Sequence, residues 1–236
     1  MSRSWKGLVV LALVVGAVCV RLAFWQLDRL GARRARNAVV LAARTAEPVV
    51  LGPGRLGAEL DQRRVRMRGE FDRAGEIVIR GASWDGGPGV RVVTPFRPEG
   101  TDTLVLVDRG FVPAPDAVSA QLEGHEEPGP REVAGIALEI PSRDDGGEPL
   151  ERRGSTTWRG LDLAALRARS AAPLAAISVL QTPDSALPPW PRRQAPPALD
   201  DGPHLSYALQ WFGFALIAVG GAVAVGLKRE VGSLPN

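Results

Sequence analysis

Cysteine and histidine are scarce in this chain. Its 236 residues include one cysteine, Cys19, and two histidines, His125 and His204. A single cysteine excludes an internal disulfide and any zinc site that needs a pair of thiolates. Two histidines argue against a histidine-rich metal site. Because Cys19 lies inside an apolar run, we expect it to act as an apolar helix residue with no redox or metal role.

The central part of the chain also lacks an excess of positive charge. The formal charge of the whole chain is +3, but the excess comes from basic residues near the two ends, outside residues 28–201. A protein that binds nucleic acid carries its basic patch on the folded part. We therefore expect no nucleic-acid partner.

Charged residues are absent from a long stretch near the start. Residues 7–20 carry none, and Trp5 and Trp25 bracket the apolar run. Their separation is roughly 30 Å on an α-helix, about the thickness of the hydrocarbon layer, whose boundaries favour aromatic residues. This pattern predicts a transmembrane helix over 7–27, with Arg21 reaching to the headgroups. A cleaved signal peptide is the alternative, but no small-residue cleavage site follows the run.

A second uncharged stretch, Tyr207 to Leu227, predicts another transmembrane helix over 206–227. Small residues let two membrane helices approach closely. We expect this contact to use Ala12, Gly16, Gly213, Gly220, Gly221 and Ala224. Both termini then lie on one side of the membrane, and a single domain over 28–203 lies on the other. The basic residues beside the spans do not decide which side is which.

Residues 28–44 are rich in helix formers and lack proline, so the first helix is expected to continue out of the membrane. Alternating apolar and polar residues then predict strands. These expected strands are 65–71, 76–80, 90–96, 103–107, 133–140 and 174–180, with a short helix over 161–169. Two segments rich in proline, 113–131 and 184–203, read as loops. The prediction is a small β-rich α+β domain, for which a barrel is one arrangement.

Signatures of catalysis are missing from this domain. It has no P-loop, no GxSxG elbow and no HExxH. Asp108-Arg109-Gly110 is expected to be a salt-bridged strand end, and His125 an exposed loop residue. Asp144-Asp145 lacks a third clustered ligand, so we expect no metal there. The chain is therefore not expected to be an enzyme.

The start of the second span is the more informative place. On a helix, positions 204, 207, 208 and 211 share a face, so His204, Tyr207 and Trp211 line up. His204 precedes Lys228 by roughly 36 Å of helix, which places the imidazole at the headgroup level. It could ligate a haem iron, with the apolar tail of the haem between the two helices. It could instead be an interfacial anchor, which the residues alone favour.

Several short elements run in a recognisable order along nearly the whole chain. They are Trp25-Gln26-Leu27-Asp28-Arg29-Leu30, Gly69-Glu70-Phe71-Asp72, Gly87-Pro88-Gly89, Val92-Val93-Thr94-Pro95, residues 104–113, Trp158 with Asp162, and His204-Leu205-x-Tyr207-Ala208-x-x-Trp211-Phe212. With these elements and two terminal spans the chain resembles the SURF1 family, whose members are needed to assemble haem-copper cytochrome c oxidase. The chain departs from the family at Gly31 to Arg34, where an aromatic residue and a lysine are common. It departs again at Asp200-Asp201-Gly202-Pro203, where asparagines are common.

The resemblance implies a multi-pass protein of the bacterial plasma membrane with cytoplasmic termini and an extracytoplasmic central domain. It also implies transient binding of haem a and help with its insertion into oxidase subunit I. The expected partners are subunit I, the proteins that make and deliver haem a, and membrane lipid. His204 is the implied ligand of the haem iron. From the residues themselves we expect Tyr207 and Trp211 to pack on the macrocycle and Arg21 to pair with a propionate. The alternative is a scaffold that clamps an oxidase intermediate by protein contacts alone. An enzyme on a membrane tether is a weaker third interpretation.

Overall fold

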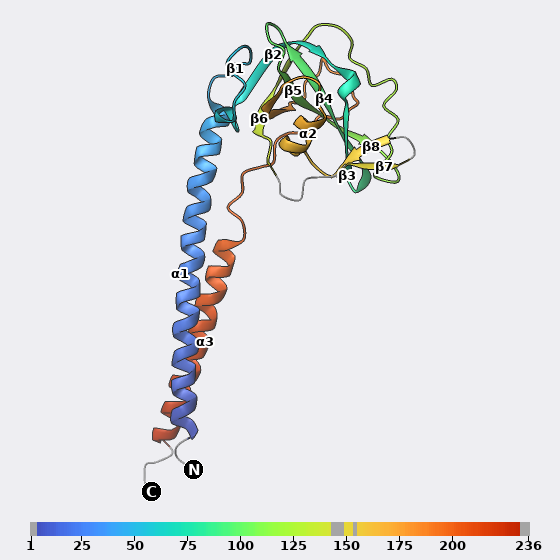
Figure 1. Ribbon diagram of the computed structural model, residues 1–236. Helices are drawn as coiled ribbons and strands as arrows, with labels where there is room; N and C mark the ends of the chain where they lie inside the picture. Colours follow the sequence, from blue (N-terminus) through green and yellow to red (C-terminus); the bar gives the residue numbers. More distant parts are fainter. Residues whose placement is uncertain (1–3, 143–148, 153–154, 232–236) are drawn as a thin grey trace. The chain divides into compact units, whose positions relative to one another are not determined.

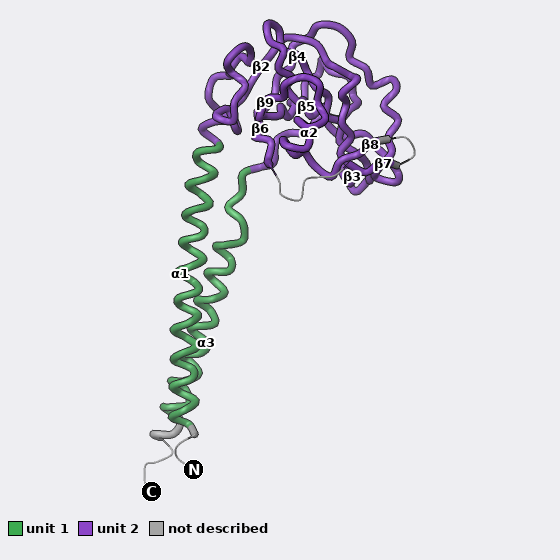
Figure 2. Tube along the Cα trace, viewed as in Figure 1, with its two compact units in different colours: residues 1–40, 199–236 green, residues 41–198 purple. Residues whose placement is uncertain are grey.

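The computed structural model describes residues 4–142, 149–152 and 155–231. The chain divides into two compact units, residues 1–40 with 199–236 and residues 41–198 (Figure 2). The Asp144-Asp145 pair lies outside the described residues. The elements, in chain order, are α1 Ser4–Thr45, β1 Val49–Val50, η1 Ala58–Leu60, β2 Arg64–Phe71, η2 Arg73–Gly75, β3 Ile77–Trp84, β4 Gly87–Pro98, β5 Leu104–Pro113, β6 Arg131–Glu139, β7 Leu150–Arg152, β8 Ser155–Trp158, α2 Leu163–Arg169, β9 Leu174–Gln181 and α3 His204–Val231.

The first unit is a pair of helices, α1 and α3, that run side by side (Figure 1). Both contain an apolar segment long enough to cross a membrane, within Trp5–Thr45 and His204–Leu227. The predicted continuation of α1 beyond the apolar run is confirmed, because α1 ends only at Thr45. Pro48 follows three residues later, where a proline ends helical geometry.

Small side chains form the seam between these helices. Only some of the residues predicted for this contact take part in it. The buried positions on α1 include Gly16, Cys19 and Ala23, and those on α3 are Ala208, Ala215 and Ala222, which are seven residues apart. A Cβ atom added at Gly16 would lie 3.1 Å from Val219. The prediction for Gly213, Gly220 and Gly221 is wrong, since a Cβ atom on any of them would meet open space. On α3 the seven-residue spacing of alanines, and not the glycines, defines the contacting face.

The second unit is built on a closed five-stranded barrel. Its strands are hydrogen-bonded in the order β2-β6-β9-β5-β4, and a pairing of β4 with β2 closes the ring. At this closure a Cβ atom on Gly69 would lie 1.9 Å from the carbonyl oxygen of Arg97. Gly69 therefore lets two backbones come together where the barrel closes. The predicted α+β class, with terminal helices and a barrel-like domain, is confirmed.

The barrel is filled by the inward residues of its strands. The alternation predicted for β2 is confirmed, since Val65, Met67 and Gly69 are buried and Arg64, Arg66 and Arg68 are exposed. The inner cluster also includes Phe96, Val105, Val107, Val133, Ile177 and Val179. A second cluster packs α2 against the outside of the sheet through Leu163, Leu166 and Trp158. Burial of these apolar surfaces is the main stabilising term of the domain.

Three strands, β3, β4 and β5, extend several residues farther than predicted, and three short strands, β1, β7 and β8, were missed. β4 begins at Gly87, because the turn from β3 needs only Asp85 and Gly86, both at positive φ. β5 continues to Pro113, beyond the end expected near Val107. The short strands β7 and β8, which extend the sheet beside β3, had too little alternation to be recognised.

Candidate functional site

His204 opens α3 and contacts α1 through a hydrogen bond. Its Nδ1 lies 2.9 Å from Oε1 of Gln26. Both side chains are half-buried. Gln26 directly follows Trp25, the aromatic residue at the predicted membrane boundary, so the pair joins the two helices at that level. His204 was predicted as a site residue from the sequence, whereas Gln26 was recognised only as part of the motif Trp25 to Leu30 and no role was predicted for it.

A tight turn sets the position of His204. The backbone N–H of Gly202 donates to Oδ1 of Asp200 at 3.0 Å, and Gly202 has a φ of 67°. Pro203 follows, and its carbonyl oxygen accepts from the N–H of Tyr207 at 3.1 Å, the first backbone hydrogen bond of α3. Aspartate, a glycine at positive φ and proline each favour such a turn before a helix. The position of His204 at the start of α3 thus follows from local chain chemistry.

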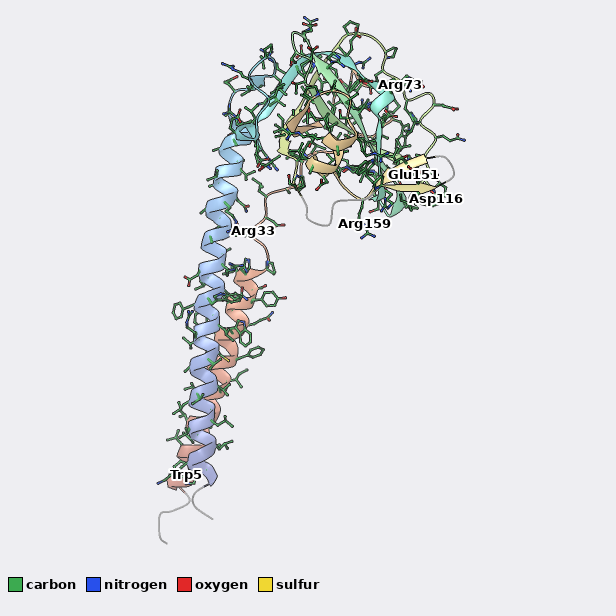
Figure 3. All side chains as sticks on the ribbon, viewed as in Figure 1. Trp5, Arg33, Arg73, Asp116, Glu151 and Arg159 are labelled. Atoms are coloured by element: carbon green, nitrogen blue, oxygen red, sulfur yellow. The ribbon has the colours of Figure 1, made fainter. Side chains whose placement is uncertain are left out.

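The two departures from the SURF1 pattern meet in the structure. Arg33 donates to Oδ1 of Asp200 at 2.9 Å, and Arg34 pairs with Asp201 at 2.8 Å. Asn37 adds a hydrogen bond of 2.7 Å to the carbonyl oxygen of Asp200. Figure 3 labels Arg33 on α1. Two basic residues thus hold two acidic residues, and both pairs lie beside the turn that carries His204.

The other predicted site residues on α3 do not share one environment. Trp211 is half-buried and makes an edge-to-face contact with Phe214 at 5.8 Å, whereas Tyr207 is 46% exposed. Ala208, between them, is fully buried in the seam. His204 and Trp211 therefore flank the contact with α1, and Tyr207 points toward the surroundings.

Buried alanines and a pair of aromatic rings line the seam at this level. Ala23 on α1 and Ala208 on α3 are buried between the two helices, and the ring centroids of Phe24 and Phe212 are 5.6 Å apart. The haem tail expected between α1 and α3 stays a prediction. Tyr207 and Leu205 are exposed on the outer surface of the helix pair. Arg21 is also exposed and lies five residues before Gln26, roughly 7.5 Å farther along α1 toward the membrane interior.

The barrel domain carries a buried charge cluster that the sequence analysis missed. Glu127 is 4% exposed and pairs with Arg109 at 2.9 Å, with Arg131 at 2.6 Å and with Arg193. Arg109 also pairs with Glu76 at 3.2 Å. Glu127 belongs to the segment after β5, Arg193 to the segment after β9, and the other two arginines to barrel strands. The cluster therefore ties two long loops to the barrel.

Electrostatics keep Glu127 ionised. Burial alone would raise the pKa of its carboxyl group, but hydrogen bonds and charges from Arg109 and Arg193 outweigh burial and lower it below 4.5. Burial lowers the pKa of Arg193, and the charge of Glu127 opposes this. All members have charged partners, so the cluster acts as structural support.

The motif Asp108-Arg109-Gly110 belongs to the same support. Its expected salt bridges are confirmed, because Asp108 pairs with Arg91 and Arg109 with Glu127. Its expected place at a strand end is wrong: β5 continues past it, with a register shift between Val92 and Val93 on the neighbouring strand. A Cβ atom on Gly110 would lie 2.1 Å from the carbonyl oxygen of Arg192, so glycine lets the return segment pack on β5.

The remaining candidates show no metal chemistry. His125 is half-buried, not fully exposed as expected, and its carbonyl oxygen accepts a hydrogen bond from Arg109. Within the described ranges, no group of three or more His, Cys, Asp or Glu side chains is placed to hold a metal ion. His204 therefore remains the candidate ligand residue next to the predicted membrane boundary.

Comparison with known proteins decides the family. The profile of the SURF1 family matches residues 13–216, which include most of α1, the barrel and the first part of α3. The chain belongs to the SURF1 family. Its membership suggests a role in cytochrome c oxidase assembly, and SURF1 proteins are known as assembly factors and not as enzymes.

Individual SURF1 relatives cover most of the chain. A SURF1-like protein of Monosiga brevicollis is 27% identical over 98% of this chain and 92% of its own length. An uncharacterized SURF1-like protein of Mycobacterium tuberculosis is 30% identical over 92% of this chain and 82% of its own length. Surfeit locus protein 1 of Takifugu rubripes is 31% identical over 52% of this chain and 58% of its own length.

Proposed function

We propose that this SURF1 protein assists the assembly of haem-copper cytochrome c oxidase by holding haem a transiently and helping its insertion into subunit I. The observation that carries the proposal is the His204–Gln26 hydrogen bond, which fixes an imidazole at the end of an apolar helix pair. A neutral imidazole is a good ligand for haem iron. Delivery needs only reversible binding, so no bond-making step is required of the protein.

The surroundings of His204 fit an amphipathic cargo with an apolar face. His204 would supply the ligand nitrogen, and the exposed ring of Tyr207 and the half-buried ring of Trp211 would contact the macrocycle. Arg21, exposed on α1, would meet a propionate. In this proposal the chain ends lie in the cytoplasm of a bacterium and the barrel domain lies outside the plasma membrane. There it meets subunit I and the proteins that deliver haem a.

The test is a haem spectrum of the purified full chain. Wild type and His204→Ala are produced in cells that make haem a, and haem content is measured by absorbance against protein. We expect wild type to retain haem a and the variant to lose at least nine-tenths of it. Equal haem in both would remove His204 as the ligand.

A scaffold that clamps an oxidase intermediate without a cofactor is the rival. The buried Glu127 cluster supports this rival, because the cluster makes the loops of the barrel domain rigid enough to present a fixed surface. The rival predicts a colourless protein and a His204→Ala variant that still supports oxidase assembly. Oxidase activity of a deletion strain complemented with that variant separates the two.

A further inference from the structure

The Gln26–His204 contact defines the protonation of the imidazole. The acceptor in this contact is Oε1 of the Gln26 amide, which carries no hydrogen and can only accept. The hydrogen of the bond must then belong to Nδ1 of His204. In a neutral imidazole the other nitrogen, Nε2, consequently holds a free lone pair.

The neighbourhood of Nε2 is kept open by a glycine. A Cβ atom added at Gly202 would lie 3.7 Å from Nε2 and 3.5 Å from Cδ2 of His204. Any larger residue there would place its side chain beside the nitrogen that carries the lone pair. Gly202 therefore serves both the turn, through its positive φ, and access to Nε2.

We propose that Gln26 is a positioning residue that holds His204 as the Nδ1–H tautomer and presents Nε2 as the ligand atom. This inference rests on the proposed function of haem binding. Histidines that bind metals almost always donate their second ring N–H to an oxygen acceptor, and loss of that acceptor typically lowers metal affinity 10–100-fold. Gln26 supplies this oxygen acceptor, although it is separated from His204 by 178 residues in the sequence.

The tautomer can be measured without haem. The full chain, labelled with 15N-histidine and placed in lipid nanodiscs, has only His125 and His204 to assign, and His125→Gln identifies each signal. At a pH where the imidazole is neutral, protonated and bare ring nitrogens resonate in separate regions. We expect Nδ1 of His204 to be protonated in wild type, and Gln26→Leu to shift the population toward Nε2–H.

Two further variants make the result specific. Gln26→Glu keeps an oxygen acceptor and should retain the wild-type tautomer. Gln210→Leu makes the same change as Gln26→Leu at an exposed position of α3 and should change nothing. In haem titrations, Gln26→Leu should bind 10–100-fold more weakly than wild type, with Gln26→Glu close to wild type.

The outcomes separate this inference from the proposed function. An Nε2–H tautomer in wild type, which a reversed Gln26 amide would produce, overturns the role of Gln26. So does a Gln26→Leu spectrum identical to wild type. If the tautomers behave as expected but wild type and His204→Ala hold equal haem, the positioning of the ring stands and its use for haem is refuted.

Discussion

The carboxylate of Glu127 connects parts of the chain that are far apart in sequence. It accepts charged hydrogen bonds from Arg109 and Arg131 on barrel strands and from Arg193 in the return segment. Removal of one partner from a buried charged group leaves the others uncompensated, which is strongly destabilising. Glu127 is therefore the residue at which the loops of the domain are most sensitive to a single change.

The Glu127→Gln variant should lose stability in a pH-dependent way. At neutral pH we expect its free energy of unfolding to be about 3–5 kcal/mol lower than in wild type. The pKa of Glu127 is depressed in the folded state. Its stabilisation is therefore present above 4.5, the ordinary value, and is lost as the pH falls through the folded pKa below 4.5. The variant should lack this acid-dependent loss.

Chemical denaturation of the full chain in detergent, repeated between neutral pH and acid, measures this difference. Glu123→Gln is the matched control, because Glu123 lies exposed on the same loop and should leave the curve unchanged. Parallel pH curves for wild type and Glu127→Gln would refute the role of the carboxylate.

Some important residues could be predicted from the sequence and others could not. His204 was recognisable because an imidazole beside an uncharged run of 21 residues is unusual. Glu127 was not, because it sits in a segment rich in proline, glycine and acids that is typical of a solvated loop. Its partners lie 4, 18 and 66 residues away, and no local periodicity reports such contacts.

At the turn before α3, the contribution of the ion pairs to stability can be measured directly by mutation. The Arg33–Asp200 pair is partly exposed, so it should contribute only about 0.2–1 kcal/mol. Asp200→Asn removes the charge and keeps an oxygen for the N–H of Gly202. In a double-mutant cycle, Arg33→Ala and Asp200→Asn should show a coupling of that size, measured as thermal or chemical unfolding in detergent.

Arg36 provides the control for this cycle. It is exposed on the same helix, so Arg36→Ala combined with Asp200→Asn should be additive. Additivity in the Arg33 cycle as well would mean that the pair contributes nothing to the turn.

Strands differ in how well they could be predicted. β2 buries one face only, so its alternation is visible in sequence. β5 is buried along nearly its whole length, and its charged residues Asp108 and Arg109 looked like a strand end because their partners were unknown. The closure of β2 on β4 was also hidden, since strand order depends on contacts far apart in the chain.

For the whole molecule, the proposed topology predicts where a label can reach. Cys19 is the one native cysteine and is buried in the helix seam, so Cys19→Ala gives a background for introduced thiols. In that background, Glu123→Cys on an exposed loop should react with a membrane-impermeant maleimide on intact cells. Gel shift after labelling measures the reaction.

A cysteine appended after Asn236 should behave in the opposite way and react only after lysis. If Glu123→Cys required lysis and the appended cysteine did not, the domain would be cytoplasmic and delivery of haem from the outer face would be refuted.

The pairing of Arg33 with Asp200 and of Arg34 with Asp201 has a consequence for engineering with relatives. A chimera that imports residues 28–37 from a relative without Arg33 and Arg34 would leave Asp200 and Asp201 without their cations. An import of residues 199–204 alone would leave the two arginines without their carboxylate partners. The two segments should therefore be exchanged together, because each side of the contact neutralises the other.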